Sequence, residues 1–320
     1  MKKGLLFAFF FSLTLGFHPE INAWGFHAHK TINRYAVFTL PTELFGFYKK
    51  NIDYITEHAV DPDKRRYAIL EEGPRHFIDI DHYGSYPFPE LPRVWEKAVA
   101  KFSEDTLIEY GIVPWNTYKV YRQLVWAFSQ KNVGRILKLS ADLGHYIGDA
   151  HVPLHATKNY NGQFTNQEGI HGLLESRLPE LFAADYDFFV GKAEYIERPQ
   201  EAIWNAVLGS AKLVDTVFSS EKMTGKNVSP QAKYAFETKG RTVVKQYSKA
   251  YSADFHARLG SMVEDRMRSS IVLLGSLWYS AWVEGGQPNL DQLAGIPEKE
   301  DAIADSAFRE GKIKGRIEAD

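Results

Sequence analysis

The sequence predicts an all-α protein built from many helices. Apolar side chains recur at helical spacing through most of the chain after residue 24, and no convincing run of strand-like alternation is visible. Hydrophobic residues make up 44% of the chain and charged residues 24%, which is enough apolar material for a sizeable core. This composition favours a folded chain over a disordered one.

The first segment of the chain has the layout of a secretory signal peptide. Lys2 and Lys3 precede an apolar stretch over residues 5–15, and the segment ends in Ile21-Asn22-Ala23. A membrane anchor is the alternative, but the apolar run is shorter than the roughly 20 residues that span a bilayer. We expect cleavage after Ala23 and export of the mature chain, either secreted or periplasmic.

The mature chain should consist of helices separated by Pro-containing breaks and polar loops. Pro41 ends the first helix, Pro199 precedes another, and Ser229-Pro230 forms a cap and first-turn pair. The apolar stretch 271–282 is too short to span a membrane and favours a buried helix. The predicted helices cover residues 29–40, 94–102, 120–129, 132–152, 169–182, 201–218, 229–251 and 252–283.

The composition changes near residue 285. Gly285-Gly286 breaks the last helix, and the residues that follow are polar and charged. The predicted organisation is therefore a signal segment over residues 1–23, one domain over 24–285 and a polar C-terminal tail over 286–320.

Charge and cysteine content restrict the function further. Signal cleavage removes two of the 38 basic residues and one of the 40 acidic ones, which leaves a formal charge of −3. The chain lacks the basic surplus that binding to duplex DNA usually needs. It contains no Cys, so a metal site would have to use nitrogen and oxygen ligands.

Histidines and carboxylates cluster in the middle of the chain. His145 and Asp149 are four residues apart, so on a helix both lie on one face within reach of one ion. His171 and Glu175 repeat this spacing. Pro153 should bend the chain after the first pair and direct His155 to a neighbouring position. Two such pairs plus His155 point to metal binding more strongly than to surface ion pairs.

Two upstream segments add weaker signals. Asp61 precedes Pro62, where a turn or helix start is the ordinary explanation, and His76 could be an interior side chain with satisfied hydrogen bonds. Asp79 and Asp81 could orient a ligating His or could be solvated turn residues. The remaining histidines near these segments are not expected to coordinate a metal ion.

Together, these segments resemble the superfamily of bacterial zinc-dependent phospholipases C and single-strand-specific zinc nucleases of the S-one/P-one type. The resemblance covers about residues 24–175. It rests on the ordered series Trp24-Gly25, His29, Asp61, His76, His145, Asp149, His155, His171 and Glu175. It implies a phospholipase C/nuclease-type helical bundle as the fold of the domain.

The resemblance also implies three zinc ions. The first would be held by Asp61, His76, His145 and Asp149, and the second by His155, His171 and Glu175. The third would use the α-amine and carbonyl of Trp24, together with His29 and a bridging Asp149. Signal-peptide removal would then complete the site, because a free amine becomes a ligand when a cation displaces its proton. Asp61 would also orient or deprotonate the attacking water.

The expected activity is hydrolysis of phosphodiester bonds, with phospholipid or another small phosphodiester as the preferred substrate class. Glu175 favours the phospholipases, whereas the short gap from Trp24 to His29 favours the nucleases. A single-strand-specific endonuclease or 3′-nucleotidase therefore stays open, as do a di-iron bundle and a non-catalytic metal-binding protein with the same fold. Tyr160 and Phe164, in the loop between the two helical pairs, could contact a base or a lipid. No obligate protein partner is expected.

Overall fold

The computed structural model describes residues 26–240 and 242–290. The predicted signal segment, Trp24 and most of the polar tail lie outside the described residues. Within the described ranges the chain is 69% helix and 5% strand, which confirms the predicted fold class in outline. None of the helices in these ranges is both long and apolar enough to cross a membrane.

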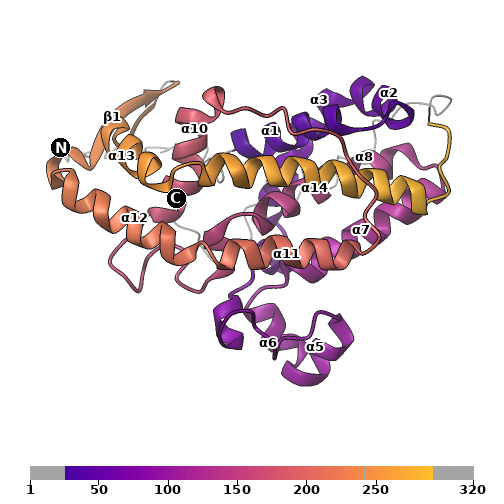
Figure 1. The fold of residues 1–320 in the computed structure, drawn as a ribbon, viewed down its shortest axis with the longest axis horizontal. Coiled ribbons are helices and arrows are strands. Elements are labelled where there is room, and N and C mark those ends of the chain that lie inside the picture. The colour runs from indigo at the N-terminus through magenta and orange to yellow at the C-terminus, as the bar shows by residue number, and fades with distance from the viewer. Residues whose placement is uncertain (1–25, 241, 291–320) are drawn as a thin grey trace, which may run out of the picture.

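The chain forms helices of very different length and one short hairpin (Figure 1). The α-helices are α1 (Phe26–Ala36), α2 (Thr42–Lys50), α3 (Ile52–Glu57), α4 (Asp61–Arg66), α5 (Trp95–Phe102), α6 (Glu104–Glu109), α7 (Val113–Ser129), α8 (Val133–Ala150), α9 (Ile170–Gly172), α10 (Leu178–Phe182), α11 (Pro199–Ala211), α12 (Val214–Asn227), α13 (Lys249–Leu259) and α14 (Met262–Glu284). The strands are β1 (Tyr234–Lys239) and β2 (Thr242–Tyr247), which pair antiparallel.

Helix α8 is the centre of the fold. Every residue from Leu139 to Ala150 is buried, and α1, α7, α11 and α14 all pack against this helix. A helix that is buried on all sides belongs to a core, so polar groups on it must find partners inside the protein. His145 and Asp149 are such groups.

Two apolar clusters surround this central helix. The larger one joins α1, α7, α8, α11 and α14 and contains the fully buried rings of Tyr121, Phe128 and Trp278. The smaller one joins the segment around residues 170–183 to α12, α13 and the start of α14. The candidate metal ligands come from elements of both clusters, so the packing of the whole fold determines their positions.

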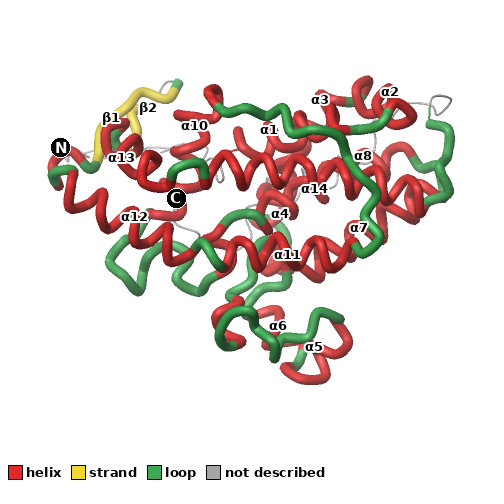
Figure 2. Tube along the Cα trace, in the orientation of Figure 1, coloured by secondary structure: helices red, strands yellow, loops and turns green. Residues whose placement is uncertain are grey.

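The segment predicted as a helix over residues 229–251 contains the hairpin (Figure 2). Its strands are rich in β-branched and aromatic residues, such as Phe236, Val243 and Val244, which favour extended backbone. Gly240 provides the positive φ of +59° needed in the connecting turn. Local β propensity therefore outweighs the helix-start signal of Ser229-Pro230.

Two other predicted helices are each interrupted. The segment 201–218 contains most of α11 and the start of α12, and the segment 252–283 is broken between α13 and α14. At the second break Gly260 adopts a φ of +61°, a conformation that residues with a Cβ rarely take. Helices α5 and α6 project from the body of the molecule (Figure 1).

Candidate metal centre

Asp149 is the hub of a buried group of imidazoles. Its Oδ2 lies 3.3 Å from His145 Nε2, one turn earlier on α8, and 3.0 Å from His76 Nδ1. Its Oδ1 lies 3.5 Å from His29 Nε2 on α1 and 3.6 Å from His155 Nδ1. One carboxylate therefore contacts side chains from four separate segments of the chain.

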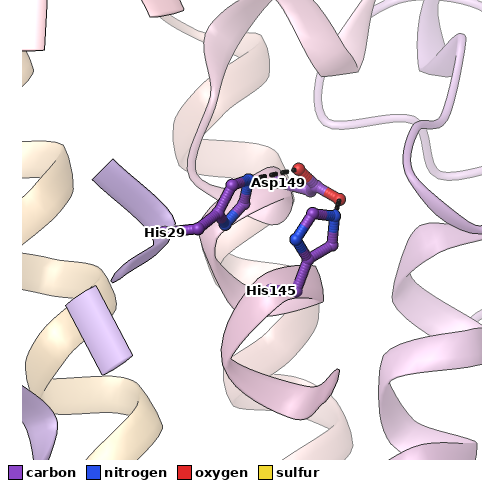
Figure 3. A group of neighbouring side chains, drawn as sticks. All are labelled: His29, His145 and Asp149. Atoms are coloured by element: carbon purple, nitrogen blue, oxygen red, sulfur yellow. Dashed lines mark ion pairs between the residues drawn. The ribbon is translucent and has the colours of Figure 1, made fainter. Parts of the chain in front are cut away.

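The first candidate group consists of His29, His145 and Asp149, whose ligand atoms all lie within 4.8 Å of one another (Figure 3). The rings of His29 and His145 stack with centroids 3.9 Å apart. This approach requires a residue without a side chain on α8, because a Cβ at Gly148 would come within 2.8 Å of His29 Nδ1. Packing of α1 against α8 thus brings the His29 ring to Asp149.

The second candidate group consists of Asp63, His76 and His145. Asp63 Oδ1 lies 3.6 Å from His145 Nε2 and 3.8 Å from His76 Nδ1, and the side chain is buried. Asp63 thus occupies the place that the resemblance assigned to Asp61.

Asp61 points elsewhere. Its carboxylate accepts hydrogen bonds from His58 Nδ1 at 2.5 Å and from Lys64 Nζ at 3.0 Å, and none of the three candidate groups includes it. Both acids belong to α4, and two residues along a helix turn a side chain by about 200°. When one of them faces α8, the other must therefore face away. The structure thus replaces Asp61 with Asp63 as the carboxylate beside His76.

The third candidate group consists of His155, His171 and Glu175. Glu175 Oε2 lies 3.3 Å from His155 Nε2 and also contacts His171 Nε2, and the two imidazoles stack with centroids 5.1 Å apart. The predicted bend is present: α8 ends at Ala150, and Pro153 opens a short 3₁₀ turn that carries His155. His171 and Glu175 lie one turn apart, with Glu175 in a π-helical turn over Leu173–Arg177.

Backbone carbonyls set the orientation of three of these rings. Nδ1 of His145, His155 and His171 contacts the carbonyl oxygen of Ala59 at 2.9 Å, of His76 at 2.6 Å and of Tyr160 at 3.2 Å, respectively. A proton on Nδ1 leaves the lone pair on Nε2, which in each case faces the carboxylates. Ligating imidazoles are commonly oriented in this way.

Asp81, a candidate for orienting a ligating ring, has another role. Its carboxylate accepts hydrogen bonds from Thr157 Oγ1 at 2.8 Å and from Lys158 N at 3.1 Å. It therefore fastens the segment that follows His155. Asp79 is buried, and its backbone N–H donates to Tyr110 O at 2.7 Å.

The electrostatics of the cluster favour ionised acids. Burial alone would raise the pKa of Asp149, but His145 and His155 outweigh it and hold this pKa well below the usual range. For His145, burial lowers the pKa, yet Asp149 and Asp63 raise it to about 9. Burial and the neighbouring His145 hold the pKa of His29 well below its ordinary value, so this ring stays neutral. Ionised carboxylates and imidazoles form a donor set suited to a cation, which would displace the proton that the raised pKa retains on His145.

The contacts in the second group test whether a cation fits there. His76 Nδ1 and His145 Nε2 face each other at 3.0 Å, and once His145 gives up its Nε2 proton, the bond from Nδ1 to Ala59 leaves a lone pair at Nε2. Within the described ranges no donor reaches the buried Asp63 Oδ2. A divalent cation would satisfy His145 Nε2 and Asp63 Oδ2 together, because the nitrogen and oxygen lone pairs converge on one point. The residues present therefore fit a metal ion.

Sequence reasoning found seven of the residues in these groups, namely His29, His76, His145, Asp149, His155, His171 and Glu175. It missed Asp63, for which the spacing Asp61-Pro62-Asp63 at a helix start was the available signal. Trp24 lies outside the described residues. No protein-family model matches the chain, and no curated protein is significantly similar to it.

Proposed function

We propose that this chain is an exported, zinc-dependent hydrolase of phosphodiester bonds. The observation that carries the proposal is the convergence on Asp149 of buried imidazoles from α1, from α8 and from the segments that hold His76 and His155. Glu175 completes a neighbouring group. Buried carboxylates and imidazoles in this number are costly unless they share a cation. Nitrogen and oxygen donors without Cys suit zinc in a catalytic role.

Each candidate group would hold one ion. The first would use His29 and Asp149, completed by the α-amine of Trp24 after signal cleavage. The second would use Asp63, His76, His145 and Asp149, and the third His155, His171 and Glu175. Bound zinc would supply Lewis-acid chemistry, because it lowers the pKa of coordinated water to about 7 and offsets charge on phosphoryl oxygens.

The protein groups would then divide the remaining work. Asp63 Oδ2 is buried beside His76 and His145 and accepts no hydrogen bond within the described residues. It is placed to accept a proton from the attacking water, the role first assigned to Asp61. As the bond from phosphorus to the leaving oxygen breaks, solvent would protonate the leaving alkoxide.

The substrate class we favour is a phospholipid or another small phosphodiester. The loop after His155 lies against the third group, with the Tyr160 ring edge-on to His171 at 6.0 Å. Phe164 in the same loop is 68% exposed, so the loop that contacts His171 presents an apolar ring to solvent. Such a ring can pack on a lipid. It can also stack on a nucleic-acid base, and single-stranded nucleic acid is the second candidate substrate.

One assay tests the proposal. The processed chain starting at Trp24 is given phosphatidylcholine vesicles and single-stranded DNA, each with and without a chelator. The proposal expects chelator-sensitive release of phosphocholine that exceeds DNA cleavage. Chelator-sensitive cleavage of DNA alone would instead support the nuclease alternative. Loaded protein that turns over neither substrate would support the non-catalytic alternative.

A further inference from the structure

A hollow separate from the metal groups lies between α7 and the projecting α5–α6 unit. We call it the aromatic hollow; its volume is about 570 Å³, and its walls include Trp95, Ile108, Ile112 and Trp115. The rings of Trp95 and Trp115 meet edge to face with centroids 5.6 Å apart. Small-molecule sites commonly have this size and this mostly apolar lining.

Two residues that line the aromatic hollow each carry a buried hydrogen-bond donor without an acceptor among the described residues. Trp115 Nε1 and Asn116 Nδ2 have no hydrogen-bond partner in this part of the chain, and the two residues are only 5% and 8% exposed. A buried N–H group without an acceptor costs free energy. A ligand that carries acceptor atoms within an apolar body would relieve this cost.

A second hollow adjoins the first. We call it the basic hollow; its volume is about 460 Å³, and it shares Arg75, Asn116 and Lys119 with the aromatic hollow. Its basic lining residues are Arg65, Arg75, Lys119, Arg135 and Lys138, whereas Glu72 and Asp142 are its acidic ones.

The two acids of the basic hollow are already paired. Asp142 accepts from Arg65 Nη1 at 3.0 Å and from Lys138 Nζ at 2.9 Å, and Glu72 accepts from Arg75 Nη1 at 2.7 Å. Neither Lys119 nor Arg135 has a carboxylate within 4.0 Å in the described part of the chain. The basic hollow thus retains positive charge that an anion would neutralise.

The distribution of charge determines how a ligand would lie. The acids Glu71, Glu96 and Glu104 balance the basic residues of the aromatic hollow, which are Arg75, Lys119 and Arg122. Basic residues outnumber acids in the basic hollow, so an anionic group belongs there. The ring-like apolar part then enters the aromatic hollow. A hydrocarbon chain would leave both donors unsatisfied, whereas a planar ring with nitrogen or oxygen acceptors can satisfy them and pack on the indoles.

We propose that the two hollows form one binding site for an anion that carries a planar, acceptor-bearing ring, such as a nucleoside monophosphate. The ring would lie beside Trp95 and accept from Trp115 Nε1 and Asn116 Nδ2. The phosphate would lie near Lys119 and Arg135. This site does not depend on the proposed hydrolase activity, since none of these residues belongs to a candidate metal group.

Binding of adenosine 5′-monophosphate to the metal-loaded, processed chain, measured by calorimetry, tests the proposal. We expect saturable binding of one molecule per chain, and weaker binding of adenosine or inorganic phosphate alone. Trp115→Phe keeps the ring but removes the N–H donor, and Lys119→Gln removes one free charge. Each should weaken binding by about tenfold, because a lost charge-assisted or buried hydrogen bond has roughly this effect.

Lys97→Gln is the matched control, because Lys97 is an exposed lysine on α5 that lines neither hollow. It should leave the binding unchanged. No binding, or binding that survives both Trp115→Phe and Lys119→Gln, would overturn the proposal. Tighter binding of a single-chain lysophosphatidic acid that depends on the same residues would overturn the argument for a planar ring.

Discussion

His76 Nδ1 lies 3.0 Å from Asp149 Oδ2, although 73 residues separate the two along the chain. His76 follows a short 3₁₀ segment over Leu70–Arg75, and Asp149 lies in the last turn of the most buried helix. A contact between two such distant segments depends on the tertiary fold as a whole.

Asp63 and Asp61 offer a matched pair of substitutions. Asp63→Asn should lower metal content and reduce activity by about 100-fold, since losses of this size already follow changes to groups that only orient ligands. Asp61→Asn should change activity less than about threefold. Asp61 forms partly exposed ion pairs with His58 and Lys64, and such pairs contribute little to the stability of the fold. Zinc content and turnover of a chromogenic phosphodiester would be measured together. Equal losses in both variants would restore Asp61 to the site.

Gly148→Ala tests the position of His29. The added methyl group would lie 2.8 Å from His29 Nδ1 and should displace that ring, which costs about one metal ion per chain and at least tenfold in activity. Gly225→Ala is the control: its methyl group meets only Tyr251 Oη, at 3.5 Å, and should stabilise α12 by up to about 1 kcal/mol. Full metal content in Gly148→Ala would remove His29 from the first group.

Phe164→Ala tests the substrate loop. The ring is 68% exposed, so its loss should leave the free energy of unfolding within about 0.5 kcal/mol of the parent value. If the ring holds substrate, KM should rise about tenfold with little change in kcat. The comparison is made on vesicles and on single-stranded DNA, and the substrate whose KM rises identifies the contact. Unchanged KM on both substrates would exclude a binding role for Phe164.

Asp142 predicts a pH dependence of stability outside the metal groups. Burial raises its pKa, but Arg65 and Lys138 outweigh burial and hold the pKa below its ordinary value. A lowered pKa in the folded state means that the stabilisation is complete above the unfolded pKa and disappears as pH falls through the folded value.

Asp142→Asn should therefore cost about 2 kcal/mol at pH 7, because Arg65 loses its closest carboxylate and keeps the longer contacts to Glu72 and Tyr146. Urea denaturation between pH 7 and pH 3 would show this difference shrinking once pH falls below about 3.8, the unfolded value of the carboxyl group. A difference that stays constant over that range would show that the ionised carboxylate is not the stabilising species.

Sequence patterns predicted local features, but they could not predict contacts between residues that are far apart in the chain. The periodicity of α8 and the spacings His145–Asp149 and His171–Glu175 are local, and local patterns predicted them well. The choice between Asp61 and Asp63 depends on which face of α4 meets α8, and this follows from tertiary packing. The hairpin at β1 and β2 was missed because a helix-start signal precedes a segment with stronger β propensity.

The count of zinc ions in the processed chain tests the central claim most directly. Protein that begins at Trp24, purified without chelator and dialysed against metal-free buffer, would be analysed by mass spectrometry of its metal content. We expect three zinc ions per chain, and two when extra residues precede Trp24, because the first group then lacks its terminal amine. A chain that retains fewer than one metal ion, yet stays folded, would contradict the claim that these imidazoles and carboxylates form a metal centre.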